Sequence, residues 1–227
     1  MSLLNKLSND LWTVFSPSKF LLFHVGTRMT VMRLSNGDVL LYSPVLIYPA
    51  LKKEIDNVGK VTHVVCPNNF HHLYAHQAMA LYPQANLHGP KALHKKRKDL
   101  SFSHILSDTP HPDWKQDIEL LTIEGSLMHE TVFYHKSSKV LLTCDIVENF
   151  KTSEHLLTRI WLKLGGCHGK ISWPIILRLV YINRKKARVS LQKMFEFPFE
   201  KVVIAHGEVL EKDARSLLRA GLNWLKV

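Results

Sequence analysis

The chain has 227 residues, of which 46% are hydrophobic, and a formal net charge of +11. This length and composition can bury a large core, either as one large domain or as two closely packed halves. We expect a single domain over residues 1–227. Its three cysteines are widely spaced and odd in number, which argues against a disulfide scaffold and for a reducing, cytoplasmic location. The polar N-terminus is unlike a secretory signal, and no apolar run reaches the ~20 residues that span a bilayer.

The first third of the chain predicts strands followed by a helix. Residues 10–15, 29–34 and 39–42 have strand character, and the Asn36-Gly37 pair predicts a hairpin between the second and third. Apolar residues at 48, 51, 55 and 58 have helical spacing, which predicts an amphipathic surface helix. A short apolar run at 61–66 predicts a buried strand.

The rest of the chain alternates strands and helices, apart from one segment. The predicted elements are a helix at 73–82, strands at 85–88, 118–123, 130–135, 140–143 and 201–205, and a last helix at 210–225, with a loop at 101–117. Alternating strands and amphipathic helices predict an α/β protein, and the hairpins predict mixed sheets.

Residues 146–197 interrupt this alternation and predict a basic helical insertion of helix, turn and helix that covers one end of the sheet. Within it, residues 151–193 hold ten Lys and Arg and one Glu, or +9 of the net charge. This segment either binds an anionic partner, such as nucleic acid or an anionic membrane surface, or is a solvated basic face. If it is a cap, Trp161 and Trp173 should be buried.

Candidate site residues lie where predicted strands end. The strand at 61–66 is followed by the breakers Pro67, Asn68 and Asn69 and then by His71 and His72. This layout places polar chemistry at the carboxyl end of a sheet. Four further candidates lie near the ends of later apolar runs: His129, Cys144, Asp145 and His206. Of these, Cys144 is more typical of a small apolar residue in a buried strand than of a ligand.

The order of four segments, PNNFHH, GSLMHE, LLTCD and VIAHG, resembles the metallo-β-lactamase fold over residues 10–227. The resemblance implies a four-layer αββα sandwich of two mixed β-sheets. In that family a His-x-His-x-Asp-His motif, a later histidine, an aspartate at a strand end and a final histidine build two metal positions. The match rests on order and spacing more than on identity, as in a divergent, uncharacterised branch.

The first motif is degenerate. The first two motif histidines fall on Pro67 and Asn69, the aspartate falls on His71, and only His72 keeps its type. In the family, the first metal position uses these first two motif histidines and the later histidine. The resemblance therefore leaves His129 as the one histidine of that position.

The second metal position can still be assembled from His72, Asp145 and His206, with His71 as a fourth ligand. Imidazole and carboxylate ligands suit Zn²⁺, and also Fe²⁺ or Mn²⁺. We expect one divalent ion, and we expect His71, His72, His129, Asp145 and His206 to converge in one cleft.

Two functions are consistent with these residues. The first is a metal-dependent hydrolase of unknown substrate, since a bound metal lowers the pKa of its water toward ~7. The second is a catalytically silent protein of the same fold that binds an anionic ligand or macromolecule. The alternative to metal binding is that the histidines are relics satisfied by hydrogen bonds. Metal content separates the two functions.

Overall fold

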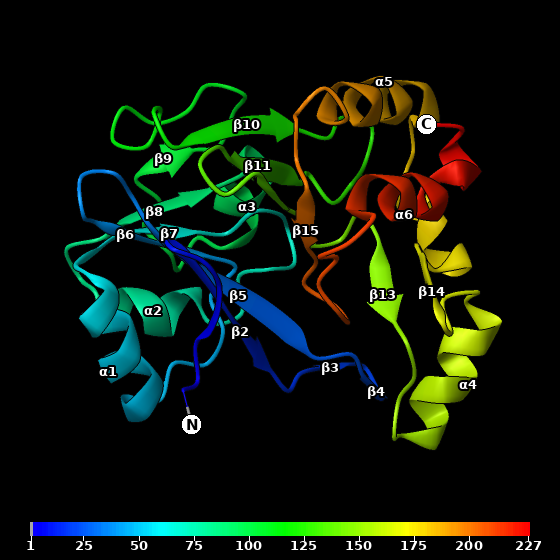
Figure 1. Cartoon of the computed structure of the whole chain (residues 1–227), viewed down its shortest axis with the longest axis horizontal. Coiled ribbons are helices and arrows are strands. Elements are labelled where there is room, and N and C mark those ends of the chain that lie inside the picture. Colours follow the sequence, from blue (N-terminus) through cyan, green and yellow to red (C-terminus); the bar gives the residue numbers. More distant parts are fainter. Residues whose placement is uncertain (1) are drawn as a thin grey trace.

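Two β-sheets lie face to face at the centre of the computed structural model, which describes residues 2–227 (Figure 1). The larger sheet has seven strands in the order β1-β2-β5-β6-β7-β8-β9. Neighbouring strands in the half β1-β2-β5-β6 pair antiparallel, and those in the half β6-β7-β8-β9 pair parallel, so the sheet is mixed. Its strands are β1 (Asn5–Ser8), β2 (Leu11–Ser16), β5 (Thr27–Arg33), β6 (Val39–Tyr42), β7 (Val61–Val65), β8 (Asn86–Gly89) and β9 (His104–Ile105).

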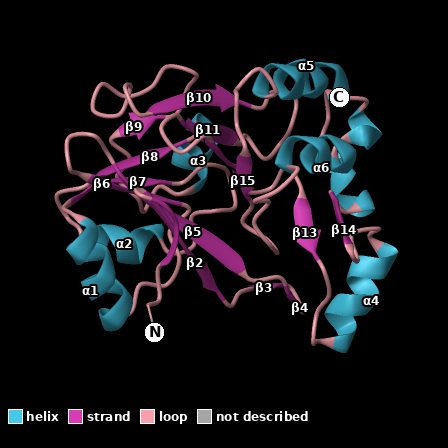
Figure 2. Ribbon diagram, viewed as in Figure 1, coloured by secondary structure: helices cyan, strands magenta, loops and turns pink. Residues whose placement is uncertain are grey.

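The smaller sheet has four strands in the order β10-β11-β12-β15. β10, β11 and β12 pair antiparallel, and β12 pairs parallel with β15. Two separate ribbons, β3-β4 and β13-β14, extend from the sheets toward one another (Figure 2). The bounds are β10 (Ile118–Thr122), β11 (Thr131–His135), β12 (Val140–Leu142), β15 (Lys201–Val203), β3 (Lys19–Phe20), β4 (Phe23–His24), β13 (Glu148–Phe150) and β14 (Lys170–Ser172).

Helices cover the outer face of each sheet, whereas α4 packs against the β3-β4 ribbon. α1 and α2 lie on the side of the larger sheet, and α5 and α6 lie on the side of the smaller one (Figure 1). The helices are α1 (Pro49–Val58), α2 (Ala75–Leu81), α3 (Lys91–Lys96), α4 (Leu156–Leu164), α5 (Arg184–Met194) and α6 (Ala214–Gly221), with 3-10 turns η1 (Ile175–Val180) and η2 (Asn223–Leu225).

Three clusters of buried apolar residues separate four layers. One packs α1, α2 and α3 on the larger sheet, through residues such as Leu51 and Val64. The second fills the space between the sheets, where Tyr42 meets Phe133. The third packs α5 and α6 on the smaller sheet, through Leu191 among others. Burying both faces of both sheets confirms the αββα arrangement predicted from the sequence.

Several elements match their predicted positions. The Asn36-Gly37 turn joins β5 to β6, and the helix predicted at 48–58 is α1. The prediction for the insertion was incomplete, because residues 146–197 also contain β13 and β14, which pair with each other. Each of these strands has three residues, too few to show a period of two in the sequence.

The insertion packs against the β3-β4 ribbon, which is distant in the sequence. The ring of Phe23 stacks on Trp161 at 5.0 Å, and the backbone N–H of His24 donates to Thr158 Oγ1 at 2.9 Å. Trp173 is buried and Trp161 is partly buried. Among the residues that the structure describes, no helix is long and apolar enough to cross a membrane.

Candidate metal centre

Three side chains converge from loops that follow strands of both sheets. His71 lies in the turn between β7 and α2, Asp145 follows β12, and His206 follows β15. β12 and β15 run parallel, so their carboxyl ends lie at the same edge of the smaller sheet. Both sheets thus contribute to one site.

The ligand atoms of this triad lie within 4.8 Å of one another. His71 Nε2 is 3.3 Å from both carboxylate oxygens of Asp145, and His206 Nε2 is 3.2 Å from Oδ1. Ligands bound at ~2.0–2.1 Å to one tetrahedral zinc ion lie roughly 3.3 Å apart, so the three groups are spaced as ligands of a shared ion.

Both imidazoles are oriented through their other nitrogen. Nδ1 of His206 donates to the carbonyl oxygen of Gly26 at 2.7 Å, and Nδ1 of His71 lies 2.8 Å from Ser43 Oγ. Metal-binding histidines are commonly fixed in this way, with Nε2 directed at the ion. The triad thus has the outer hydrogen bonds that a metal site needs.

Gly207 allows the His206 loop to approach β13 closely. Its φ of +90° is in the left-handed region, and a Cβ there would lie 2.1 Å from the carbonyl oxygen of Asn149. Arg28 donates to the carbonyl oxygens of Ile204 and Gly207 on either side of His206. These contacts fix the position of the imidazole.

Asp145 is held by two buried polar side chains. Asn68 Nδ2 donates to Asp145 Oδ2 at 2.8 Å and to Glu130 Oε2 at 3.0 Å. The backbone N–H groups of Cys144 and Asp145 both donate to the Glu130 carboxylate at 2.7 Å. Asn68 Oδ1 in turn accepts from the N–H of His71 at 2.9 Å, so one amide links both ends of the triad.

The charges in this group are strongly coupled. Burial and the charge of Asp145 raise the pKa of Glu130 to about 7, against the opposing effect of its hydrogen bonds. Although burial penalises its charge, Asp145 has a pKa well below the usual range because His71 and His206 lie beside it.

Burial disfavours the imidazolium of His206, but the hydrogen bond to Asp145 and its charge raise the pKa to about 9. Without a metal, a proton on Nε2 therefore joins the two groups at neutral pH. A divalent ion would replace that proton, so two imidazoles and one carboxylate fit a metal such as zinc.

The predicted ligand His72 has a different role. Arg97 Nη1 donates to His72 Nδ1 at 2.7 Å, and since arginine can only donate, Nδ1 is the acceptor. Burial and the charges of Lys96 and Arg97 lower the pKa of His72 to about 4, so the ring is neutral and its proton lies on Nε2. His72 lies outside the set of ligand atoms that come within 4.8 Å of one another, so it does not join the triad.

The predicted ligand His129 does not join the triad. It is exposed and has a left-handed backbone with φ of +51°. Its neighbours Met128 and Glu130 are both buried, so the side chain between them points to solvent. The expected convergence in one cleft therefore holds for His71, His72, Asp145 and His206 and not for His129. Of these four, His71, Asp145 and His206 bring ligand atoms within 4.8 Å of one another.

A cavity of about 360 Å³ opens beside the triad. Its wall is mainly apolar and comes from the β3-β4 ribbon, the β7-α2 turn and the insertion, and it includes Phe20, Phe70, Leu73, Tyr74, Met128, Trp161, Trp173, Leu177 and Val180. Two lysines, Lys19 and Lys96, also line it. The triad thus borders a space suited to an organic ligand.

Glu148 is a further acidic group in this wall. Its side chain is buried, and Oε2 has no hydrogen-bond partner among residues 2–227. Burial raises its pKa to about 7. Sequence reasoning missed Glu148, Asn68 and Glu130, although Asn68 and Glu130 lie inside the segments that carried the family resemblance.

Comparison with solved structures identifies the fold. A metallo-β-lactamase from Pontibacter korlensis superposes with a TM-score of 0.68 at 13% identity, over 98% of each chain. One from Hirschia baltica gives 0.67 at 10% identity, over 98% of this chain and 96% of that one. The metal-soaked Flv1 flavodiiron core from Synechocystis sp. PCC6803 gives 0.68 at 13% identity, over 98% of this chain and 60% of that one.

At these identities the likeness concerns the fold alone. The chain has the metallo-β-lactamase fold over nearly its whole length. Residues 8–161 match the family described as "Domain of unknown function (DUF4336)", and the chain belongs to that family. No curated protein matches the chain.

Proposed function

We propose that the protein is a metal-dependent hydrolase with a single divalent ion, zinc being the best fit, held by His71, Asp145 and His206. The observation that carries this proposal is the spacing of 3.2 and 3.3 Å between both imidazole Nε2 atoms and one carboxylate, beside an organic-sized cavity. Three protein ligands leave a coordination position open, which is typical of catalytic rather than structural sites.

A divalent ion in this position would supply a Lewis acid and lower the pKa of a bound water to ~7. The chain's own groups have separate tasks. Glu130 and Asn68 fix the Asp145 carboxylate, while Gly26 and Ser43 fix the two rings. Glu148, with a pKa raised by burial to about 7 and a free oxygen in the cavity wall, can accept and return a proton at neutral pH.

The cavity wall indicates the type of substrate. Aromatic and aliphatic side chains supply most of its surface, and Trp161 and Trp173 lie on the side of the insertion. Lys19 and Lys96 add positive charge. We therefore infer a substrate with an apolar body and an ester, lactone, amide or phosphoester group, in which a negative charge would be favoured.

The test begins with untagged protein purified without added metal, analysed by inductively coupled plasma mass spectrometry. A panel of esters, lactones, amides and phosphodiesters is then assayed with wild type, Asp145→Asn and Glu148→Gln. We expect Asp145→Asn to lose metal and activity, and Glu148→Gln to keep metal and lose activity. If the protein binds metal but hydrolyses no substrate in the panel, the catalytically silent alternative is favoured. If it takes up no Zn²⁺, Mn²⁺ or Fe²⁺, the hydrolase proposal is wrong.

A second candidate function is binding of an anionic membrane surface by the insertion. Large aliphatic side chains are exposed on α4, around η1 and at the tip of the β3-β4 ribbon: Leu21, Leu22, Leu156, Leu157, Ile160, Leu164, Ile175, Ile176, Leu179 and Ile182. We call these residues the apolar rim. Leu21, Leu164 and Leu179 are 75% exposed or more, and such clustering is unusual for a surface that faces water alone.

The parts of the apolar rim are joined by direct contacts. Phe23 stacks on Trp161, which connects the ribbon to α4, and the N–H of Ile175 donates to the carbonyl of Gly165 at 3.0 Å, which connects η1 to the end of α4. Basic residues Arg159 and Lys163 are exposed on the same helix. Apolar and basic side chains together suit the surface of an anionic bilayer.

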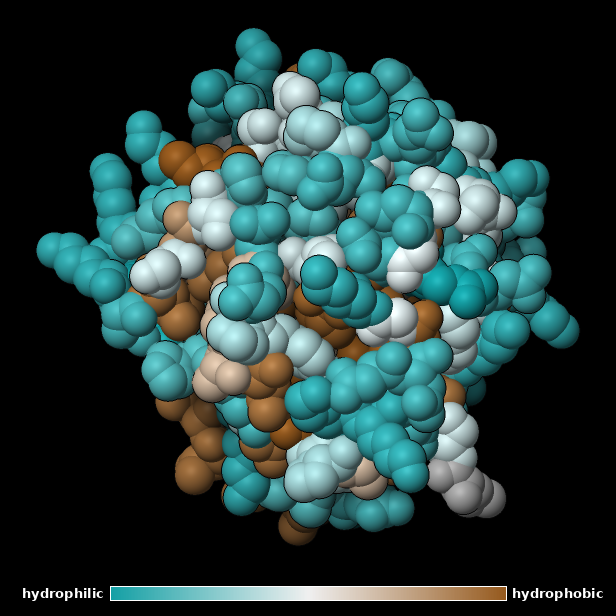
Figure 3. Space-filling view, turned by 90° about the vertical axis from the view of Figure 1, so that its left-hand side faces the viewer, coloured by the Kyte–Doolittle hydropathy of each residue, from teal (hydrophilic) through white to brown (hydrophobic). Residues whose placement is uncertain are grey.

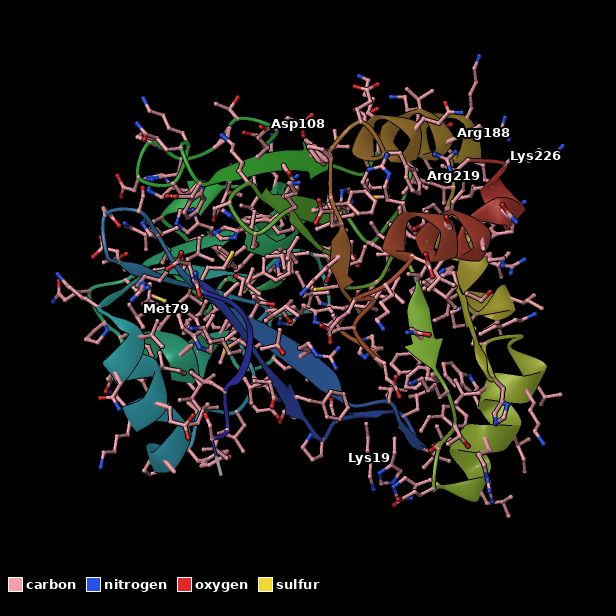
Figure 4. The ribbon with its side chains drawn as sticks, viewed as in Figure 1. Lys19, Met79, Asp108, Arg188, Arg219 and Lys226 are labelled. Atoms are coloured by element: carbon pink, nitrogen blue, oxygen red, sulfur yellow. The ribbon has the colours of Figure 1, made fainter. Side chains whose placement is uncertain are left out.

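The positive charge of the insertion is divided between two places. Arg188 is on α5, near Arg219 and Lys226 in Figure 4, whereas Arg159 and Lys163 are on α4. Lys19, in β3, adds a positive charge at the ribbon (Figure 4). Hydrophilic residues cover most of the face seen in Figure 3, on the side away from the insertion. The bilayer would therefore contact the ribbon, α4 and η1, and not α5.

Sedimentation with lipid vesicles tests this candidate. Wild type should sediment with vesicles that contain phosphatidylserine and less with pure phosphatidylcholine. A Leu157→Ser, Leu164→Ser variant should lose most of this binding, and a variant with exposed Leu73→Ser outside the apolar rim should keep it. Equal sedimentation of wild type and the double variant would exclude the apolar rim as a membrane site.

A further inference from the structure

A second group of histidines lies under the segment that links the two sheets. His63 is in β7, His88 in β8, His104 in β9 and His111 in the loop before β10. Ring centroids are 5.2 Å apart for His63 and His88, 5.0 Å for His88 and His104, and 4.5 Å for His104 and His111. Because β7, β8 and β9 are neighbours in the sheet, their pairing brings these rings together.

Within this group, His63, His111 and Asp113 have the geometry of metal ligands. Their ligand atoms lie within 4.8 Å of one another. Asp113 Oδ2 is 3.3 Å from His63 Nε2 and 3.5 Å from His111 Nδ1. These separations match the roughly 3.3 Å edge between ligands of a tetrahedral zinc ion with ~2.0–2.1 Å bonds.

His63 is the most informative member. Its side chain is fully buried, and its Nε2 forms no hydrogen bond within the part of the chain that the structure describes, although it points to Asp113. Its Nδ1 lies 3.1 Å from His88 Nε2, so a second imidazole sets the orientation of the ring. A buried nitrogen without a partner is unfavourable, and coordination of a metal would satisfy it.

Trp114 packs against the buried imidazoles. Its ring centroid lies 4.8 Å from that of His63 and 4.6 Å from that of His88. This packing helps to hold the rings in place, with the ligand atoms of His63, His111 and Asp113 within 4.8 Å of one another.

We propose that His63, His111 and Asp113 form a second site for a divalent transition metal, with zinc as the preferred ion. His63 belongs to the sheet, whereas His111 and Asp113 belong to the crossover from β9 in the larger sheet to β10 in the smaller one. A metal there would clamp the crossover onto β7. The partly exposed Asp113 leaves the remaining coordination position to water.

Zinc titration of the untagged full-length protein tests the proposal, with stoichiometry from isothermal titration calorimetry and mass spectrometry. Wild type should bind two equivalents, one per His/Asp group. A His111→Ala, Asp113→Asn variant, altered in the exposed crossover, should bind one, and so should Asp145→Asn, His206→Gln. The combined variant should bind none, and His76→Ala, which removes an exposed imidazole, should match wild type.

Two further measurements define the geometry and the role. Co²⁺ bound to Asp145→Asn, His206→Gln should show the visible absorption of a tetrahedral ion, absent after adding His111→Ala and Asp113→Asn. Zinc should also slow proteolysis within residues 106–117 at least threefold, in wild type and not in His111→Ala, Asp113→Asn.

The outcomes separate this proposal from the hydrolase proposal. One equivalent in wild type that is lost with His111→Ala, Asp113→Asn would support the second site and count against the triad of His71, Asp145 and His206. Equal stoichiometry in wild type and His111→Ala, Asp113→Asn would overturn the second site, as would equal proteolysis with and without zinc.

Discussion

Two groups of histidine and aspartate share the same spacing but differ in their surroundings. The triad of His71, Asp145 and His206 is buried beside an apolar cavity and held by Asn68 and Glu130. The group of His63, His111 and Asp113 is packed against other imidazoles and Trp114, and its carboxylate is 48% exposed.

The difference shows that ligand spacing alone does not define a role. The triad borders an apolar cavity, and Glu148 in the wall of that cavity has a carboxylate oxygen without a hydrogen-bond partner among residues 2–227. The second group instead joins two segments of the chain. Its imidazole rings pack closely on one another, so the space between them fits only a small ligand such as a metal ion. This contrast is why we propose catalysis for the first group and a structural metal for the second.

The largest effect should come from Asp145→Asn. Asp145 contacts both imidazoles of the triad. Since loss of an outer partner of a metal ligand costs 10–100-fold in affinity, loss of this shared ligand should weaken zinc binding at the triad by more than about 100-fold. Competition with a fluorescent chelator measures the change. Affinity at the second group should be unaltered, and a parallel loss at both groups would show that they are not independent.

Glu130→Gln should have the next largest effect. The substitution keeps the size of the side chain but removes the charge that accepts two backbone N–H groups and Asn68. Asp145 would then be less well oriented, with about 10–100-fold weaker zinc binding at the triad. The same chelator competition applies. Unchanged affinity would mean that Glu130 serves only the folding of this loop.

The stability of the protein should depend on pH through His88, the buried imidazole that lies against His63 of the second group. Burial, with the neighbouring histidines, lowers the pKa of His88 to about 2, against 6.5 when unfolded. Below pH 6.5 the unfolded chain therefore binds a proton that the folded chain does not, and stability falls as the pH falls. Between pH 7 and 5 this contributes about 2 kcal/mol.

Urea unfolding in the presence of chelator checks this sign. Wild type should lose more stability from pH 7 to 5 than His88→Gln does, by up to that amount. His63, His104 and His111 face His88 in both proteins, so the comparison isolates one group. An identical pH dependence in the two proteins would contradict the burial of a neutral His88.

The smallest effect is expected from His129→Ala. The side chain is exposed and lies outside the triad, so stability and zinc affinity should change by no more than about 0.5 kcal/mol, roughly twofold. Thermal unfolding and chelator competition measure both. A large loss of zinc would return His129 to the ligand set and contradict the assignment of the triad.

Much of the architecture could be predicted from the sequence because the elements have clear local signals. The hairpin at Asn36-Gly37 and the helical period of α1 are examples. The order of site segments also predicted that Asp145 and His206 would meet, which they do at 3.2 Å. Asp145 and His206 meet because each follows one of two parallel neighbouring strands, β12 and β15, so their meeting depends on the topology of the fold.

The rest depends on contacts that no local pattern encodes. The choice between His71 and His72 depends on which ring meets Arg97, a residue 25 positions away from His72. The second group joins His63 to Asp113, and α2, β8, α3 and β9 lie between these two residues in the chain, so no local motif marks it. The cytoplasmic location, the single domain and the nucleic-acid partner stay predictions.

The connections of His206 also bear on how the protein folds. Its imidazole donates to Gly26, which is 180 positions earlier in the chain, and the ribbon that closes the cavity bonds to α4 across 134 positions. Contacts between such distant residues form slowly, since long loops must close first. On the ribosome, the segment that carries His24 and Gly26 must therefore wait for α4 and for the residues around His206 before the site can assemble. We expect the triad to form only after residue 206 has left the ribosome.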